Sequence, residues 1–280
     1  HRVDRRQRQM CIRDRHISFS EVKCWSECSW RHKLLHIDKI DVFEPSPFLD
    51  FGTTVHEGCE NFLKTGNVPR ERLLENIRAA WKKNGFDDPE WYEKMPGWYK
   101  HAPVEEWCEW ATNMWNEVPS FLDETFSNWE TFEAEEMLYE SIENRDLNFK
   151  GYIDAIIKCQ DKQGKEKYWI LDWKTSGSWG WRRDKKQDIL MTAQLILYKH
   201  YWSRKHGIPL KDIRCGFILL KRGGKPGKIC ELVQVSVGPK SLDRANKIVG
   251  NMITAVRKGF FLKNRNSCKY CPFLDTPHCT

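Results

Sequence analysis

Three charged residues in the middle of the chain have the types and spacing to perform chemistry together. Asp154 lies among isoleucines, Asp172 directly follows the apolar residues 169–171, and Lys174 comes two residues later. An ionised carboxylate in such surroundings is costly unless a cation or hydrogen-bond donors compensate it. Carboxylate oxygens are the ligands that hard divalent cations prefer, and a nearby ammonium can offset charge that develops in a reaction. These residues therefore predict a metal site that activates water, with a salt bridge on an edge strand as the alternative.

The segments that carry these residues have the composition of two neighbouring β-strands. Residues 149–159 and 168–175 are rich in β-branched and aromatic residues, and Asp161–Gly164 between them has hairpin-turn chemistry. Because side chains alternate faces along a strand, we expect Asp172 and Lys174 to project the same way. The ammonium would then lie beside the carboxylates.

Four short motifs follow one another along the chain. They are Gly52-Thr-Thr-Val-His56, Gly151-Tyr-Ile-Asp154, Asp172-Trp-Lys174-Thr175 and Gln194-Leu-Ile-Leu-Tyr198. Each motif is weak alone, but in this order they resemble the PD-(D/E)XK nucleases, specifically the RecB-like branch that includes phage exonucleases and CRISPR-associated nucleases. The resemblance covers residues 17–280.

The resemblance implies an α/β fold with a restriction-endonuclease-like core, in which helices flank a central mixed β-sheet. It also implies a set of ligands for Mg²⁺ or Mn²⁺, namely His56, Asp154, Asp172 and the carbonyl group of Trp173. In such a site Lys174 would orient the nucleophilic water and offset transition-state charge. Without the resemblance, a lone helical histidine such as His56 is more often a core or surface residue than a ligand.

Gln194 and Tyr198 are four residues apart on a predicted helix, so they share one face of it. In the family these two residues lie by the active site, where they could position the substrate or an attacking water. The alternative is an ordinary amphipathic helix with one polar residue on its inner face.

Hydrophobic periodicity predicts the remaining elements. We expect helices over residues 17–36, 51–64, 70–84, 188–206 and 241–259, and strands over residues 133–142, 213–221 and 229–237. The strand over 133–142 should pair antiparallel with that of Asp154, where Glu135 or Glu136 could join the metal site through water.

Residues 89–130 form a segment of unusual composition with six tryptophans. Their spacing predicts a helical insertion ahead of the sheet, with a helix that Pro119 breaks. Tryptophans at helical spacing are more often core residues than platforms for stacking single-stranded bases.

Two further segments stand out by composition. Residues 176–186 combine glycine, tryptophan and basic residues, which favours either contacts to a nucleic-acid backbone or a solvated loop. Residues 1–16 lack an initial Met and any periodicity, and six arginines and two aspartates fall within residues 1–15. They resemble translated adapter read-through, so we expect a non-native or disordered leader followed by one nuclease domain, residues 17–280.

The last residues, 260–280, are rich in cysteine and are predicted to form a clasp. Cys268 and Cys271 are a Cys-x-x-Cys pair that can converge on one metal, and Cys279 follows eight residues later. RecB-like nucleases of this kind complete a [4Fe-4S] cluster with a cysteine of the N-terminal helix, and the resemblance implies Cys28 for that role. The family usually has proline after this cysteine, whereas Ser29 follows Cys28, which leaves Cys24 as a rival.

The gap before Cys279 is longer than the family commonly shows, and His278 is available as a substitute ligand. A structural Zn²⁺ site is therefore one alternative to the cluster, and the absence of any metal is another. In either metal case the role would be structural rather than catalytic.

Composition bounds the class of protein. Of the 280 residues 40% are hydrophobic, yet no apolar run is long enough to cross a membrane and no secretory signal is visible. The formal net charge of +7 falls to about +3 without residues 1–15, which is compatible with nucleic-acid binding but does not require it. Eleven cysteines, an odd count, favour a reducing cytoplasm.

We therefore expect a cytoplasmic, Mg²⁺- or Mn²⁺-dependent nuclease with DNA as its partner and no membrane association. An exonuclease acting in recombination, repair or phage DNA processing is favoured over an endonuclease. The alternatives are a DNA-binding module that does not cut, or a scaffold subunit of a recombination or CRISPR-adaptation complex with a helicase or recombinase as partner.

Overall fold

The computed structural model describes residues 16–42, 44–94, 103–269 and 271–279. The expected leader lies outside these residues except for His16. That residue instead begins a strand, because it pairs in parallel register with Asn148. Trp98 of the tryptophan-rich segment also lies outside them.

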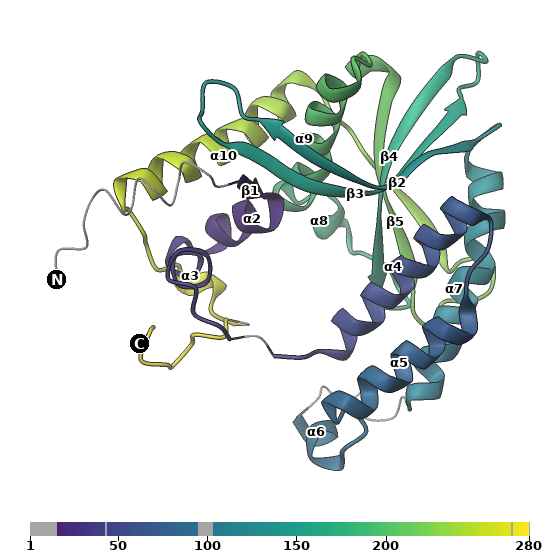
Figure 1. The fold of residues 1–280 in the computed structure, drawn as a ribbon, viewed down its shortest axis with the longest axis horizontal. Coiled ribbons are helices and arrows are strands. Elements are labelled where there is room, and N and C mark those ends of the chain that lie inside the picture. The colour runs from purple at the N-terminus through teal and green to yellow at the C-terminus, as the bar shows by residue number, and fades with distance from the viewer. Residues whose placement is uncertain (1–15, 43, 95–102, 270, 280) are drawn as a thin grey trace.

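A mixed six-stranded sheet forms the centre of the molecule (Figure 1). Its strands are β1 (His16–Ser18), β2 (Glu130–Ser141), β3 (Asn148–Gln160), β4 (Glu166–Ser176), β5 (Ile213–Lys221) and β6 (Cys230–Val235). β3 pairs antiparallel with β2 and β4, β4 pairs parallel with β5, and β5 pairs antiparallel with β6. The mixed sheet expected from the sequence is confirmed, with the short β1 as an addition.

The strands β3 and β4 separate at one point that decides the position of the site. Their ladder runs from Gln160↔Glu166 to Ala155↔Leu171 and then stops, and β1 takes the place beside residues 148–150 of β3. Asp154 and Asp172 are the residues just beyond the last pair. The two carboxylates therefore lie where the hairpin partners diverge.

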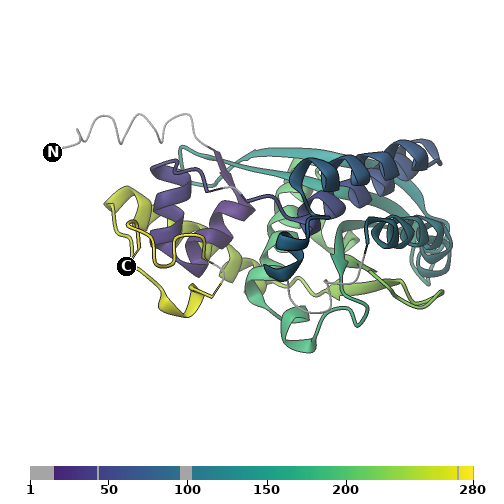
Figure 2. The ribbon, with the colours of Figure 1, turned by 90° about the horizontal axis from the view of Figure 1, so that it is seen from below.

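Helices cover both faces of the sheet (Figures 1 and 2). They are α2 (Phe19–Glu27), α3 (Ser29–His32), the π-helical turn η1 (Lys33–Ile37), α4 (Pro47–Thr65), α5 (Arg70–Asn84), α6 (Pro89–Lys94), α7 (Val104–Thr125), α8 (Arg183–Lys186), α9 (Ile189–His206), α10 (Pro239–Lys258) and the 3-10 turns η2 (Leu210–Asp212) and η3 (Arg265–Ser267). On one face, α4, α5 and α7 share a core with Leu171 and Trp173 of β4. On the other, α2, α9 and α10 share a core with Ile170.

Local signals account for several of these boundaries. α5 spans the residues predicted from its apolar spacing and ends at Gly85, whose φ of 65° is a left-handed conformation that glycine adopts without strain. α9 is capped by Asp188, the residue before it, whose carboxylate accepts hydrogen bonds from the backbone N–H groups of Leu190 and Met191. These caps satisfy groups that a helix end leaves unpaired.

Two expected helices differ from the structure. The helix predicted over 17–36 is interrupted, because Cys28 adopts an extended conformation between α2 and α3. α7 continues through Pro119 to Thr125, although proline removes a helical hydrogen bond. Val118 and Leu122 on either side of Pro119 are fully buried, and this packing holds the helix together.

The described tryptophans of the 89–130 segment serve mainly as core. Trp107 and Trp115 are buried, and the indole N–H of Trp115 donates to the Val55 carbonyl of α4 at 3.1 Å. A Cβ on Gly58 would lie 2.1 Å from the Trp115 ring, so glycine at this position allows α7 to approach α4 closely.

Candidate active site and cysteine cavity

Asp172 is the most deeply buried charged residue of the site. It is 1% exposed, and its Oδ2 lies 2.5 Å from the Lys174 Nζ. Its Oδ1 accepts a hydrogen bond of 2.8 Å from the Gln194 side chain on α9. Asp172 and Lys174 project together, as strand alternation predicts, and the neutral amide of Gln194 from the adjacent helix layer holds the carboxylate in place.

Asp154 occupies the other side of the divergence between β3 and β4. Its Oδ2 accepts the backbone N–H of Trp173 at 2.9 Å and lies 3.3 Å from the Nδ1 of His56 on α4. Trp173 lies beyond the β3–β4 ladder, and its N–H therefore bonds to a side chain of β3. His56 and Gln194 come from the helical layers on opposite faces, and they meet around the carboxylates only because the strands separate here.

Burial and mutual repulsion set the charge states of this group. Burial raises the pKa of Asp154 well above its usual value, and the charge of Asp172 raises it further. Burial lowers the pKa of His56 to about 4, although the charge of Asp172 opposes this shift. Burial would also lower the pKa of Lys174, but the two aspartates outweigh it and the net shift is upward. At neutral pH the site holds a neutral imidazole and a charged ammonium.

The donor set fits a hard divalent cation. A buried and a partly buried carboxylate that repel each other need positive charge. Carboxylate, neutral imidazole and backbone carbonyl groups are suitable ligands for Mg²⁺ or Mn²⁺. A hydrogen bond with the backbone of Trp173 acts to raise the pKa of His56. This backbone therefore lies against the imidazole. Within the described ranges, no three His, Cys, Asp or Glu side chains are gathered closely enough to be ready-made metal ligands. The side chains are instead arranged in pairs.

Tyr198 lies against the backbone of β3. Its hydroxyl is 3.4 Å from the Gln194 Nε2, and a Cβ added to Gly151 would be 2.6 Å from its ring. Burial raises the pKa of Tyr198, so the phenol is neutral. The structure thus brings together Gln194, Tyr198 and Gly151. The sequence did not reveal why the Gly-x-x-Asp motif begins with glycine, and the close approach of the Tyr198 ring supplies the physical reason.

The two glutamates of β2 have different surroundings. Burial raises the pKa of Glu135, and the nearby charges of Glu60 and Asp172 raise it further. Its φ of 58° is unusual for a residue with a side chain. Glu136 lies on the opposite face, where it is 8% exposed and accepts hydrogen bonds from three groups of α9, those of Trp202, Lys205 and His206. Of the two glutamates expected near the metal, Glu136 is held by groups of α9, whereas the pKa of Glu135 responds to the charge of Asp172.

The four cysteines expected to act as ligands line a single cavity of about 60 Å³, whose walls include Cys28, Cys268, Cys271 and Cys279. Cys24 is not among these residues; its thiol interacts with Arg31. The His278 side chain is not part of the wall either, and its backbone carbonyl accepts a hydrogen bond from the Trp30 indole at 3.0 Å. Cys28, but neither Cys24 nor His278, thus lines the cavity with the three C-terminal cysteines.

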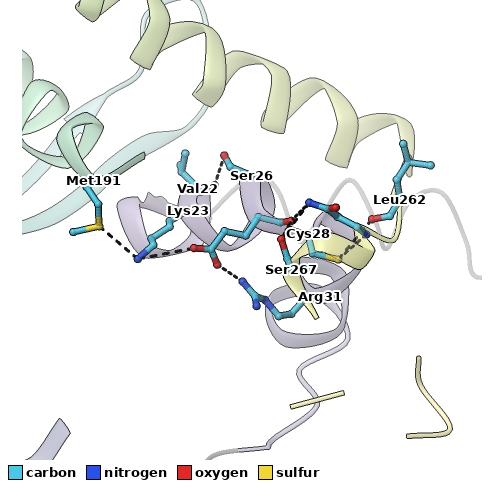
Figure 3. A network of polar contacts seen from close by, with 10 residues as sticks. Val22, Lys23, Ser26, Cys28, Arg31, Met191, Leu262 and Ser267 are labelled. Carbon is cyan, nitrogen blue, oxygen red and sulfur yellow. Dashed lines mark hydrogen bonds and ion pairs between the residues drawn. The ribbon is translucent and has the colours of Figure 1, made fainter. Parts of the chain in front are cut away.

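Polar contacts hold the two ends of the chain together around this cavity (Figure 3). The side chains of Asn264 and Ser267 both donate to the Glu27 carbonyl at 2.8 Å, and so satisfy the last turn of α2. The backbone N–H of Asn264 lies 3.4 Å from the Cys28 Sγ, and the Cys28 thiol lies 3.8 Å from the Leu262 carbonyl. Cys28 is therefore fixed by residues from the other end of the chain.

A mixed sheet between helical layers, with paired aspartates and a lysine where two strands diverge, defines a nuclease of the restriction-endonuclease-like class. The family model described as the PD-(D/E)XK nuclease superfamily matches residues 16–276. The chain belongs to the PD-(D/E)XK nuclease superfamily. These nucleases generally use divalent metals such as Mg²⁺ and act on DNA.

Solved structures show a similar fold. The crystal structure described as "Putative exonuclease" from Eubacterium rectale has 12% sequence identity and a TM-score of 0.53, covering 93% of this chain and 88% of that one. A second, described as SSO0001, has 15% identity over 93% of this chain and 97% of that one, but its TM-score of 0.35 is too low to support an argument. A search of curated proteins gives no significant match. None of the helices in the described part of the chain could span a membrane.

Proposed function

We propose that this protein is a Mg²⁺- or Mn²⁺-dependent nuclease that hydrolyses phosphodiester bonds of DNA. The observation that carries the proposal is the contact of Lys174 with the buried carboxylate of Asp172, beside a second, partly buried carboxylate, Asp154, whose pKa is raised. Carboxylates that repel each other in an apolar setting destabilise the folded protein. Groups with pKa values shifted in this way are typical of a functional site.

Each side chain has a role in this proposal. Asp154, Asp172, His56 and the Trp173 carbonyl would hold the metal. When bound, the metal would polarise the scissile phosphate and make a nucleophile of water at neutral pH. The Lys174 ammonium would orient that water and offset the charge of the transition state. Gln194, which donates to both Asp172 and Tyr198, would keep the Asp172 carboxylate aimed at the metal.

Digestion from a DNA end is the mode that we propose. The fold resemblance to a protein described as an exonuclease supports it, as does the order of the four motifs. A role in recombination, repair or phage DNA processing would follow from that activity. A helicase, a recombinase or a CRISPR-adaptation complex would be a suitable partner.

We also propose a structural [4Fe-4S] cluster ligated by Cys28, Cys268, Cys271 and Cys279, with Zn²⁺ as the alternative. The support is that all four line one cavity that joins the two ends of the chain. Iron, sulfide and zinc analysis of anaerobically purified protein, with its visible absorption spectrum, distinguishes the two metals. Protein that folds with neither metal would contradict this part of the proposal.

The test of catalysis is degradation of end-labelled linear DNA by anaerobically purified protein with Mg²⁺ or Mn²⁺. Asp172→Ala and Lys174→Ala are the paired variants, and both should lose cleavage while the parent cuts. The label released gives the polarity, and a circular single strand separates end-dependent digestion from internal cleavage. A folded, metal-loaded parent that cuts no form of DNA would overturn the catalytic proposal in favour of a DNA-binding or scaffold protein.

A further inference from the structure

Trp179 is displayed on the surface directly after the strand that carries Asp172 and Lys174. It is 96% exposed, although tryptophan is the side chain with the largest apolar surface to bury. It lies in a tight turn in which the N–H of Gly180 donates to the Gly177 carbonyl at 2.9 Å. Gly180 has a φ of 69°, a conformation available to glycine without strain.

The exposure of Trp179 does not come from a loosely held loop. Trp181, two residues later, is buried and packs against Phe217 of β5 with ring centroids 5.1 Å apart. The Lys185 ammonium of α8 lies 4.6 Å from the centre of the Trp181 ring. The turn is thus anchored immediately beside Trp179.

The same anchor places the turn next to the candidate active site. Lys174 lies 6.0 Å from the centre of the Phe217 ring, so one aromatic residue contacts both the site lysine and the turn. Burial lowers the pKa of Lys185, and the charges of Lys23 and Lys174 lower it further. The charges of these lysines act on one another, and Lys23 reaches from α2 to within 3.9 Å of the Met191 sulfur at the start of α9 (Figure 3).

Positive charge continues along the surface beyond Trp179. Residues 182–186 contain four basic residues and one acidic residue, and the side chain of Arg182 is 88% exposed. Polyanions are attracted to such a segment, and an exposed aromatic ring among basic groups is the arrangement by which proteins hold unpaired nucleobases, since every base has a face that can stack.

We propose that Trp179 stacks on an unpaired nucleobase of DNA, and that the basic residues of 182–186 attract the adjoining phosphates. The segment would thereby guide a single-stranded end toward Asp172 and Lys174. This inference rests on the proposed nuclease function, and it names the substrate feature that the site selects, an unpaired strand.

The test is DNA binding in EDTA, where cleavage does not interfere. A single-stranded oligonucleotide with 2-aminopurine near its end reports stacking by fluorescence quenching, and anisotropy of a labelled strand reports affinity. Trp179→Ala should weaken binding of the single strand by about five- to a hundredfold, the range expected for one stacked base. Trp179→Phe should retain most of the quenching. Phe260→Ala, which removes an aromatic side chain 58% exposed beyond the end of α10, is the matched control and should bind as the parent does.

The salt dependence of binding, and the comparison of a single strand with a blunt duplex, give a second readout. Arg182→Gln should weaken single-strand and blunt-duplex binding alike and reduce the slope of log affinity against log salt by about one. Trp179→Ala should affect a blunt duplex much less than a single strand. Equal loss on both forms, or no loss on either, would overturn the stacking assignment.

The two proposals fail separately. Protein that cuts DNA with Mg²⁺ while Trp179→Ala binds single strands as the parent does would refute the stacking and leave the nuclease. Protein that binds single strands through Trp179 yet cuts nothing would refute the nuclease and leave the stacking. A parent that binds no single-stranded DNA overturns the stacking, whatever its activity.

Discussion

Gly151 lies directly against the ring of Tyr198, where an added Cβ would be 2.6 Å from the ring Cε1 atom. This contact brings α9 close enough for the Gln194 side chain to reach Asp172. Gly151→Ala should therefore lower the free energy of unfolding by about 1–3 kcal/mol, the usual cost of overpacking, and should reduce DNA cleavage. Denaturant unfolding and end-label assays measure the two effects.

The double variant Gly151→Ala with Tyr198→Ala is the control for that contact. Because the second change removes the ring that the new methyl group meets, the two losses of stability should sum to more than the loss in the double variant. Strict additivity would mean that the contact between residues 151 and 198 does not explain the glycine.

Asp154→Asn should stabilise the metal-free protein at neutral pH. Burial and the charge of Asp172 raise the pKa of Asp154 above its unfolded value near 3.8. A carboxyl with a raised folded pKa contributes stability that is present below the unfolded pKa and is lost as the pH rises through the folded pKa. The neutral amide avoids that loss, so in EDTA the variant should unfold at higher denaturant concentration than the parent, with a smaller dependence on pH.

Added Mg²⁺ should reverse this order, since a ligand that binds only the folded state stabilises it. The parent should gain stability with Mg²⁺ and Asp154→Asn should gain little, while losing cleavage. A variant less stable than the parent in EDTA would show that Asp154 serves the fold rather than a cation.

Replacement by glutamine should affect the stability of the protein differently at Glu136 and at its neighbour Glu135, both on β2. Burial would raise the pKa of Glu136, but its bonds with Lys205, His206 and Trp202 outweigh burial and lower it. Glu136 thus contributes stability that is present above the unfolded pKa near 4.5 and is lost as the pH falls through the lower folded pKa. Glu136→Gln should destabilise the protein at pH 7 by about 1–3 kcal/mol.

Glu135→Gln is the matched control, because the folded pKa of Glu135 is raised instead. It should leave stability at pH 7 unchanged or improved while weakening Mg²⁺-dependent cleavage. Thermal unfolding of both variants over a range of pH separates the two roles, and a parallel loss of stability in both would be evidence against this division.

Cys28→Ser and Cys24→Ser form a pair that tests the ligand set of the cavity. Cys28 lines the cavity, whereas Cys24 interacts with Arg31. Iron or zinc content should fall in Cys28→Ser and persist in Cys24→Ser, as measured by metal analysis of purified protein. The reverse pattern would assign Cys24, four residues earlier on α2, as the ligand.

Much of the fold follows from local sequence signals. Apolar spacing and a terminal glycine are enough to place α5, and a nearly continuous apolar run places β5 (Ile213–Lys221) at its observed bounds. The exceptions are elements whose partners are distant in sequence. β1 exists because residues 148–150 offer it a free edge, and α7 passes through Pro119 because its neighbours are buried. No local rule contains that information.

The sequence by itself determined that Asp172 and Lys174 project together, because the pleat of a strand alternates its side chains, and that four motifs occur in the order of a nuclease family. Only the tertiary structure decided that β3 and β4 part at Asp154, so that His56 and Gln194 reach the carboxylates from opposite layers. It also placed Cys28 rather than Cys24 in the cavity and left Trp179 exposed on an anchored turn. These relationships depend on contacts between segments far apart along the chain, and the energies of such contacts are set by packing rather than by local spacing.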